Sequence, residues 1–231
     1  MSLPKNVSVV QMHVEEIKKI AAKKLGFAIN LDNPSKFCDL KPAYGFLFSE
    51  YTAGYDFWGY CDIDIIFGNI RHFITNRLLS SFDVITVLND FLAGYFSIFR
   101  NTKKINTVFK QSKDYRKVFT SAEHFCFDEC NFLFQKIDEG FKLEDIPSAI
   151  ESMTHVIRRL HKKNYLKVHF DTYSLQGTAG KLKWQNGILM YKNRYEIILY
   201  HLIQFKKNYQ PVKLRKIPDT FRISKTRIYW P

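Results

Sequence analysis

Two aspartates that directly follow an aromatic segment are the residues of this chain best suited to chemistry. Asp62 and Asp64 come after Phe57–Cys61, which reads FWGYC and is expected to form a buried strand. Side chains at positions i and i+2 of an extended chain point the same way, so both carboxylates would face one point. Mg²⁺ and Mn²⁺ favour oxygen ligands and are often held by one or two carboxylates together with substrate phosphates. The pattern therefore favours a divalent cation that carries a diphosphate.

A second interpretation of the same pair needs no metal. The two acids would end the strand by pairing with Arg or Lys, or would cap the next helix, because an unpaired buried carboxylate is costly. A D-x-D pair alone supports this interpretation more often than the first. The aromatic strand before it and the helix-like segment Asn69–Leu79 after it favour the metal.

The composition indicates a single globular domain. The chain has 231 residues, of which 46% are hydrophobic and 16% aromatic, enough to build a core. No apolar run approaches the ~20 residues of a membrane span, and the first residues turn polar too soon for a signal peptide. The four cysteines lack zinc-site spacing and are expected to be free thiols in a reducing compartment, with Cys61 buried. A cytoplasmic location is expected.

The formal net charge of +13 indicates either an anionic partner or a basic surface that has no partner. The excess lies mainly in Arg100–Lys117, Arg158–Lys167 and Lys206–Arg227. It is compatible with nucleic acid, with the anionic inner face of a membrane, with a pocket for a nucleotide diphosphate, or with a basic surface that binds nothing. Nucleic acid ranks lowest, because no nucleic-acid-binding motif accompanies the charge.

The order of expected elements indicates an α/β fold. Helices and strands alternate up to about Leu160, and strands dominate from Tyr165 to Trp230. We expect a mixed sheet flanked by helices, with a strand-rich C-terminal part, in one domain over residues 1–231. The expected strands are Val7–Val10, Val84–Leu88 and Gly94–Phe99, with a turn at Gln185–Gly187. The expected helices run from Val14 to an end at Gly26, over Asn69–Leu79 and over Asn101–Phe109. A capping box at Ser148 and Glu151 is expected to start a further helix, which contains Met153, Ile157 and Leu160.

The segment KFCDLKPAYGFLF (Lys36–Phe48), followed by YDFWGYCDIDIIFGN (Tyr55–Asn69), resembles a bacterial glycosyltransferase family of the GT-A fold that has long been catalogued as of unknown function. The resemblance extends to FCFDECNF (Phe125–Phe132) and RYEIILYHLIQFKKN (Arg194–Asn208), and is most specific at the D-x-D block. It implies a GT-A-like, Rossmann-like sheet. Such chains usually open with a strand that packs on the nucleoside base, and no such strand precedes Val7, so an N-terminally truncated domain is expected.

The resemblance implies roles for several residues. Asp62 and Asp64 would hold Mn²⁺ or Mg²⁺ against the diphosphate of a nucleotide-sugar donor, and His201 would complete the coordination. Lys206 would contact phosphate. For His201, an ordinary hydrogen-bonding histidine remains the alternative. Lys41 would reach a donor phosphate from the edge of the pocket, or would form a surface ion pair with Asp39 instead.

Asp128 and Glu129 lie in an aromatic setting and are candidates to face the acceptor. Activation of an acceptor hydroxyl in an inverting transferase needs a carboxylate base with a tuned pKa; in a retaining enzyme the same group would orient the acceptor. Asp128 is favoured of the two. The alternative is a pair of acids at a helix N-terminus.

We therefore expect a metal-dependent glycosyltransferase that moves a sugar from a nucleotide donor, a UDP-sugar by preference, to a hydroxyl of a bacterial surface polysaccharide or lipid-linked saccharide. Peripheral association with an anionic membrane would fit the basic surface. The competing hypotheses are a nucleotidyltransferase, which typically adds a Gly-rich loop and a third carboxylate, and a non-catalytic basic protein that binds nucleic acid or acidic glycan.

Overall fold

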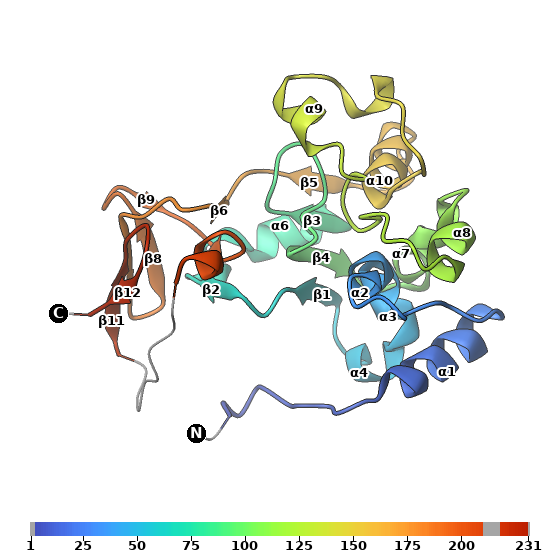
Figure 1. The fold of residues 1–231 in the computed structure, drawn as a ribbon, viewed down its shortest axis with the longest axis horizontal. Coiled ribbons are helices and arrows are strands. Elements are labelled where there is room, and N and C mark those ends of the chain that lie inside the picture. The colour runs from blue at the N-terminus through green and yellow to red at the C-terminus, as the bar shows by residue number, and fades with distance from the viewer. Residues whose placement is uncertain (1–2, 210–217, 231) are drawn as a thin grey trace.

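The computed structural model describes residues 3–209 and 218–230 and confirms the mixed α/β class (Figure 1). A four-stranded sheet lies at the centre, in the order β1 (Phe57–Cys61), β4 (Phe96–Arg100), β3 (Val84–Thr86) and β5 (Val168–Phe170). The strands β1, β4 and β3 are antiparallel neighbours, whereas β5 is parallel to β3.

The strand β1 is buried on one face only. Trp58 and Tyr60 are buried, and the indole of Trp58 stacks on Phe99 with ring centroids 4.8 Å apart. Gly59 and Cys61 are exposed, so the expectation of a wholly buried strand with a buried Cys61 is wrong. Its run of bulky residues resembled a core strand, but the period of two sends alternate residues outward.

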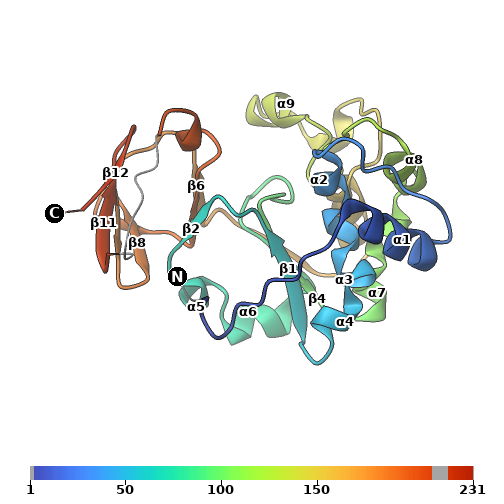
Figure 2. The ribbon, with the colours of Figure 1, turned by 60° about the horizontal axis from the view of Figure 1, so that its bottom comes forward.

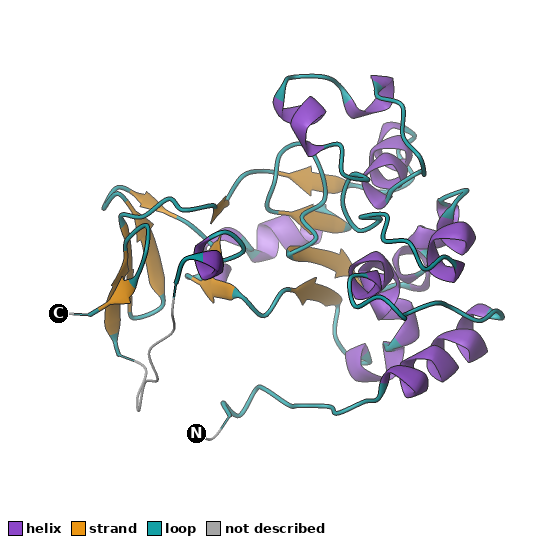
Figure 3. Cartoon of the chain, in the orientation of Figure 1, coloured by secondary structure: helices purple, strands orange, loops and turns teal. Residues whose placement is uncertain are grey.

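Helices cover both faces of this sheet (Figures 1 and 3). The larger group lies on the face that carries Val84 and Phe99: α1 (Val14–Leu25), α2 (Lys36–Leu40), η1 (Lys41–Ala43), α3 (Tyr44–Leu47), α7 (Lys103–Asn106), η2 (Val108–Gln111), α8 (Tyr115–Thr120) and α10 (Met153–Lys162). The short helix α4 (Ser49–Thr52) follows α3 and has no buried residue. The opposite face, which carries Ile85, packs against α5 (Ile70–Phe73) and α6 (Asn76–Ser81). The short elements α9 (Phe134–Asp138) and η3 (Leu143–Asp145) precede α10.

The C-terminal part is strand-rich, as predicted. A three-stranded sheet has the order β2 (Ile65–Phe67), β10 (Leu199–His201) and β6 (Ser174–Gln176). A five-stranded antiparallel sheet has the order β12 (Ile228–Tyr229), β11 (Thr220–Ile223), β7 (Leu182–Gln185), β8 (Ile188–Tyr191) and β9 (Tyr195–Glu196). It lies at one end of the molecule (Figure 2). The predicted turn joins β7 to β8, with φ of 49° at Asn186 and 84° at Gly187, as this tight hairpin requires.

The structure confirms most of the other predicted helices and strands, with changed bounds. The helix α1 ends as predicted, at Gly26 with φ of 83°. The strands at Val84–Leu88 and Gly94–Phe99 are present as the shorter β3 and β4, and the helix over Asn101–Phe109 is present as α7 and η2. The predicted helix over Asn69–Leu79 is two short helices, because the Thr75 hydroxyl caps a new start at α6.

Two local predictions are wrong. Val7–Val10 forms no strand and is exposed, since no neighbouring strand pairs with it among the described residues. Ser148 and Glu151 form no capping box, because α10 begins only after Ser152. The Ser148 hydroxyl donates to Asn131 Oδ1 instead, and the Glu151 carboxylate accepts from the backbone of Lys113. No helix in the described part of the chain is long and apolar enough to cross a membrane.

Candidate metal and saccharide site

Asp62 and Asp64 lie on the bend that leads from β1 into β2. The backbone N–H of Asp62 donates to the Tyr95 carbonyl at 3.1 Å, and the Asp64 carbonyl accepts from the N–H of Leu202 at 2.9 Å. Ile63, between them, projects fully into solvent. The two backbone bonds therefore fix both carboxylates while the residue that separates them faces away.

His201 brings a third donor to these carboxylates. It ends β10, which pairs antiparallel with β2 so that His201 lies opposite Ile65. Its Nε2 is 3.7 Å from Asp62 Oδ2 and 3.6 Å from Asp64 Oδ1, and the three donor atoms lie within 4.8 Å of one another. The fold thus gathers the three residues that were predicted to bind metal.

Two lysines hold the outer oxygens of the same carboxylates. Lys41 Nζ donates to Asp62 Oδ1 at 2.6 Å, and Lys206 Nζ donates to Asp64 Oδ2 at 2.6 Å. Lys206 lies in η4 (Phe205–Lys207), directly after β10. Because each lysine occupies one oxygen, Asp62 Oδ2 and Asp64 Oδ1 are left directed at the imidazole.

The donor set fits a divalent cation of the Mn²⁺ or Mg²⁺ type, since it combines carboxylate oxygens with one imidazole nitrogen. Burial lowers the pKa of His201, which favours the neutral ring that a metal requires. Burial alone would raise the pKa of Asp64, but the hydrogen bond from Lys206 and its positive charge hold that pKa below its ordinary value, so the carboxylate stays ionised. His201 Nδ1 is buried and has no hydrogen-bond partner in the described chain.

Tyr95 orients the imidazole and was not foreseen from the sequence. Its ring stacks on that of His201, with centroids 4.5 Å apart and planes at 28°. The Tyr95 hydroxyl is 2.7 Å from Ser174 Oγ, which in turn donates to the Val87 carbonyl at 3.0 Å. This chain of contacts ties the ring that backs His201 to β6 and to the end of β3. Its sequence signal was weak, since Gly94-Tyr95 looked like the start of a strand.

Lys41 is buried and lies between two acids. Besides Asp62, its ammonium contacts the Gly94 carbonyl at 2.7 Å and Asp128 Oδ2 at 3.7 Å. Burial opposes its charge, but Asp128 and Asp62 raise the pKa of Lys41 above its ordinary value. The alternative of a surface ion pair with Asp39 is wrong, because Asp39 is itself buried and accepts from Lys36 at 2.7 Å.

Asp128 and Glu129 lie next to Lys41 and Gly94, but their carboxylates differ in hydrogen bonding. Both lie in a turn that precedes α9, not at a helix N-terminus as the alternative held. Glu129 Oε1 accepts from the N–H of Gly94 at 2.8 Å, and its Oε2 accepts from the Cys126 thiol at 3.3 Å. Asp128 is buried, and burial followed by repulsion from Glu129 raises its pKa well above the ordinary value. Burial also raises the pKa of Glu129. Asp128 is therefore the better placed of the two to exchange a proton.

Gly94 makes this arrangement possible. A Cβ at this position would lie 2.5 Å from Asp128 Oδ2 and 2.8 Å from Glu129 Cγ. Only a residue without a side chain lets the backbone at 94 approach both acids while its carbonyl holds Lys41.

A cavity of about 570 Å³ opens beside these residues. Its volume lies in the range of small-molecule sites. Five of the seven predicted residues line it: Lys41, Asp62, Asp128, Glu129 and His201. Asp64 and Lys206 are not among its lining residues. The lining residues that sequence reasoning missed include Cys38, Phe91, Gly94, Tyr95, His124 and Gln176. They come from four separate parts of the chain, which no local spacing connects.

A second group of potential ligands, Asp39, His124 and Asp128, also lies within 4.8 Å. It is a structural cluster. Asp39 accepts from Lys36 at 2.7 Å and from the backbone N–H groups of Phe125 at 3.0 Å and Phe127 at 2.8 Å. Its oxygens are therefore engaged in holding the segment that carries Asp128.

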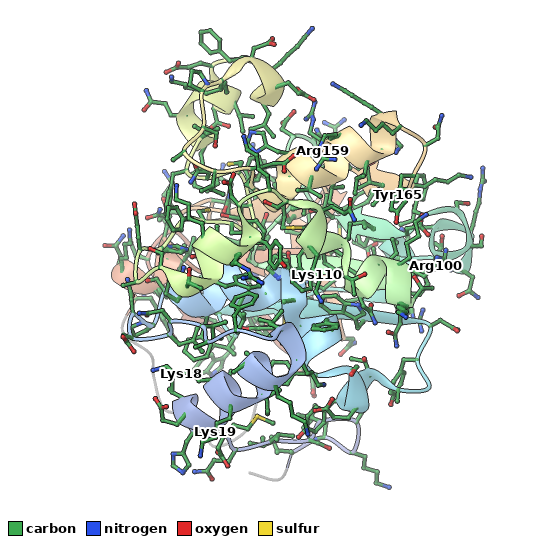
Figure 4. All side chains as sticks on the ribbon, turned by 90° about the vertical axis from the view of Figure 1, so that its right-hand side faces the viewer. Lys18, Lys19, Arg100, Lys110, Arg159 and Tyr165 are labelled. Carbon is green, nitrogen blue, oxygen red and sulfur yellow. The ribbon has the colours of Figure 1, made fainter. Side chains whose placement is uncertain are left out.

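The basic surface is only partly neutralised. Figure 4 shows the helical side of the molecule, with Lys18, Lys110 and Arg159 among the labelled side chains. Arg100 pairs with Asp83 at 3.0 Å and Arg159 with Glu151 at 2.8 Å. The third basic run, Lys206–Arg227, falls partly on residues 210–217, outside the described residues.

Fold and site together define a mixed α/β protein with a carboxylate–imidazole cluster beside a cavity that holds a buried lysine and a buried acid. The chain belongs to a family described as "Family of unknown function (DUF6625)", whose model matches residues 1–230. No curated protein and no solved structure matches it.

Proposed function

We propose that this protein is a metal-dependent glycosyltransferase of the GT-A type. It moves a sugar from a nucleotide-sugar donor, a UDP-sugar by preference, to a hydroxyl of a bacterial surface polysaccharide or lipid-linked saccharide. The observation that supports this most is the convergence of Asp62, Asp64 and His201 within 4.8 Å, beside a cavity that also holds Lys41 and Asp128.

On the donor side, Asp62, Asp64 and His201 hold Mn²⁺ or Mg²⁺. When bound, the cation neutralises the charge that grows on the departing nucleoside diphosphate. Lys206 and Lys41 each already donate to one of the acids. As the diphosphate arrives, the exposed Lys206 turns towards it, while the buried Lys41 stays beneath the site and holds the Asp62 carboxylate in place.

On the acceptor side, Asp128 takes the proton of the attacking hydroxyl or orients that hydroxyl. Its raised pKa makes the Asp128 carboxylate a stronger base than an ordinary aspartate. Lys41, 3.7 Å away, stabilises the carboxylate form. Glu129 serves by holding the N–H of Gly94 and so fixing the loop between the acids.

A thermal-shift screen of nucleoside diphosphates and their sugars, with and without Mn²⁺, tests the proposal, because a ligand that binds the native state raises the midpoint. A UDP- or GDP-compound with Mn²⁺ is expected to stabilise the wild type, and Asp64→Asn to abolish that gain. The matched control is Asp56→Asn, an exposed acid just before β1 whose carboxylate contacts no group in the site. If no nucleotide shifts the midpoint in the presence of Mn²⁺, the proposal fails.

A nucleotidyltransferase remains the second candidate, because Asp128 is a third carboxylate bridged to Asp62 through Lys41. Adding a nucleoside triphosphate to the same screen separates the two. A glycosyltransferase releases nucleoside diphosphate from a nucleotide sugar, whereas a nucleotidyltransferase releases pyrophosphate from the nucleoside triphosphate.

A further inference from the structure

A basic hollow of about 430 Å³ lies in the five-stranded sheet, away from the residues assigned above. It forms where β7 begins and β8 and β11 end. Four of its lining residues are cations, and no described Asp or Glu lines it: Lys181, Lys183, Lys192 and Arg222. Asn193, Ser224 and Tyr229 add hydrogen-bonding groups.

Two of these cations face each other across neighbouring strands. Lys183 of β7 and Arg222 of β11 are register partners in the antiparallel pair. Like charges directly opposite each other destabilise a sheet. Lys183 pairs with Met190 of β8 on its other side, and Met190 pairs in turn with Glu196 of β9. The Glu196 carboxylate lies 4.0 Å from His72 Nδ1 instead of contacting the cations. Within the described chain none of the four cations has an acidic partner within 4.0 Å, so the repulsion is uncompensated.

The backbone holds two of these lysines side by side. The N–H of Lys192 donates to the Lys181 carbonyl at 2.9 Å. Lys192 and Asn193 have φ of 54° and 53°, as the tight turn between β8 and β9 requires, and the N–H of Arg194 closes that turn by donating to the Tyr191 carbonyl at 3.1 Å.

We propose that this hollow is an anion-binding site for a phosphate or carboxylate group carried by a saccharide. Such a group would supply the negative charge that the sheet lacks, and the planar guanidinium of Arg222 can bind either oxyanion in a bidentate manner. Trp184, the next residue along β7, points to the opposite face of the sheet from Lys183, and there its Nε1 donates to the Phe67 carbonyl at 2.9 Å. The hollow is therefore an accessory site for an acidic acceptor, separate from the cavity beside Asp62, an assignment that rests on the proposed transferase activity.

Thermal shift with inorganic phosphate, at constant ionic strength and without metal or nucleotide, tests the site itself. Wild type is expected to gain stability in phosphate beyond that in chloride. Lys183→Gln is expected to unfold at a higher temperature than wild type in chloride, because the repulsion with Arg222 is gone, and to lose the phosphate gain. Lys183→Arg should keep the gain, as should Lys19→Gln, which removes an exposed cation on α1.

Titration with a uronic-acid oligomer and with a sugar phosphate then identifies the group. We expect Lys183→Gln to weaken binding of the true ligand by roughly tenfold, as befits one charge-assisted contact. Binding of either ligand supports the site and names its chemistry. If phosphate and uronate act no differently from chloride, or if Lys183→Gln keeps the full gain, the site is overturned. Because the assay contains no nucleotide or Mn²⁺, its failure is distinct from failure of the transferase proposal.

Discussion

The ring of Tyr95 backs the imidazole of His201, with centroids 4.5 Å apart and an interplanar angle of 28°. Groups that orient a metal ligand contribute to affinity without touching the ion. We expect Tyr95→Leu, which removes the stack, to weaken Mn²⁺ binding by about tenfold, whereas Tyr95→Phe keeps the ring and stays near wild type. Isothermal titration with Mn²⁺ measures both. Equal affinity in Tyr95→Leu and wild type would show that β10 alone orients His201.

The buried acid Asp128 predicts a pH dependence of stability. Burial, followed by Glu129, raises its pKa in the folded chain above the ordinary value of 3.8. The folded chain therefore binds this proton more tightly than the unfolded chain does, and ionisation removes stability as the pH rises from the ordinary pKa through the raised one. Asp128→Asn cannot ionise, so its melting temperature relative to wild type should increase as the pH rises above the ordinary value of 3.8.

The control for this series is Asp56→Asn, which removes an exposed acid and should follow the wild type at every pH. A relative melting temperature of Asp128→Asn that stays flat or falls with pH would mean that Lys41, 3.7 Å away, keeps Asp128 ionised throughout.

The buried pair of Lys36 and Asp39 anchors the segment that carries Asp128. Their side chains are each 1% exposed and lie 2.7 Å apart. Removing one partner of a buried pair leaves the other uncompensated, so Asp39→Asn should cost about 3–5 kcal/mol of unfolding free energy. Urea unfolding measures the loss. The exposed pair of Lys18 and Asp32 serves as control, because Asp32→Asn should change little.

Sequence reasoning found the residues whose partners are set by short spacing or by the resemblance. Asp62 and Asp64 converge because one exposed residue separates them, and His201 joins them through strand pairing. The alternative that paired Lys41 with Asp39 is wrong, because Asp39 turns into the protein to accept from the N–H of Phe127, while Lys41 reaches Asp62 across the fold. Tyr95 and Gly94 were missed for a related reason, since their roles depend on contacts with residues far along the chain.

The spacing of hydrophobic residues predicted whether a segment is a helix or a strand, but it did not predict where that helix or strand begins and ends. It located α1 and α10. The Thr75 hydroxyl starts α6 in the middle of an apolar stripe, whereas α10 begins after Ser152, whose side chain makes no capping hydrogen bond, and not at Ser148. The anion hollow had no linear signature, because its cations come from strands that are paired only in the folded sheet.

The bend from Asp62 to Asp64 has one more consequence. The strand before it belongs to the four-stranded sheet, and the strand after it belongs to the three-stranded sheet that contains His201. A cation bound by both acids and this imidazole would therefore add a direct link between two sheets that already pack on each other. Binding of the cation should then be measurable away from the ligands themselves, as slower amide hydrogen exchange along β2 and β10.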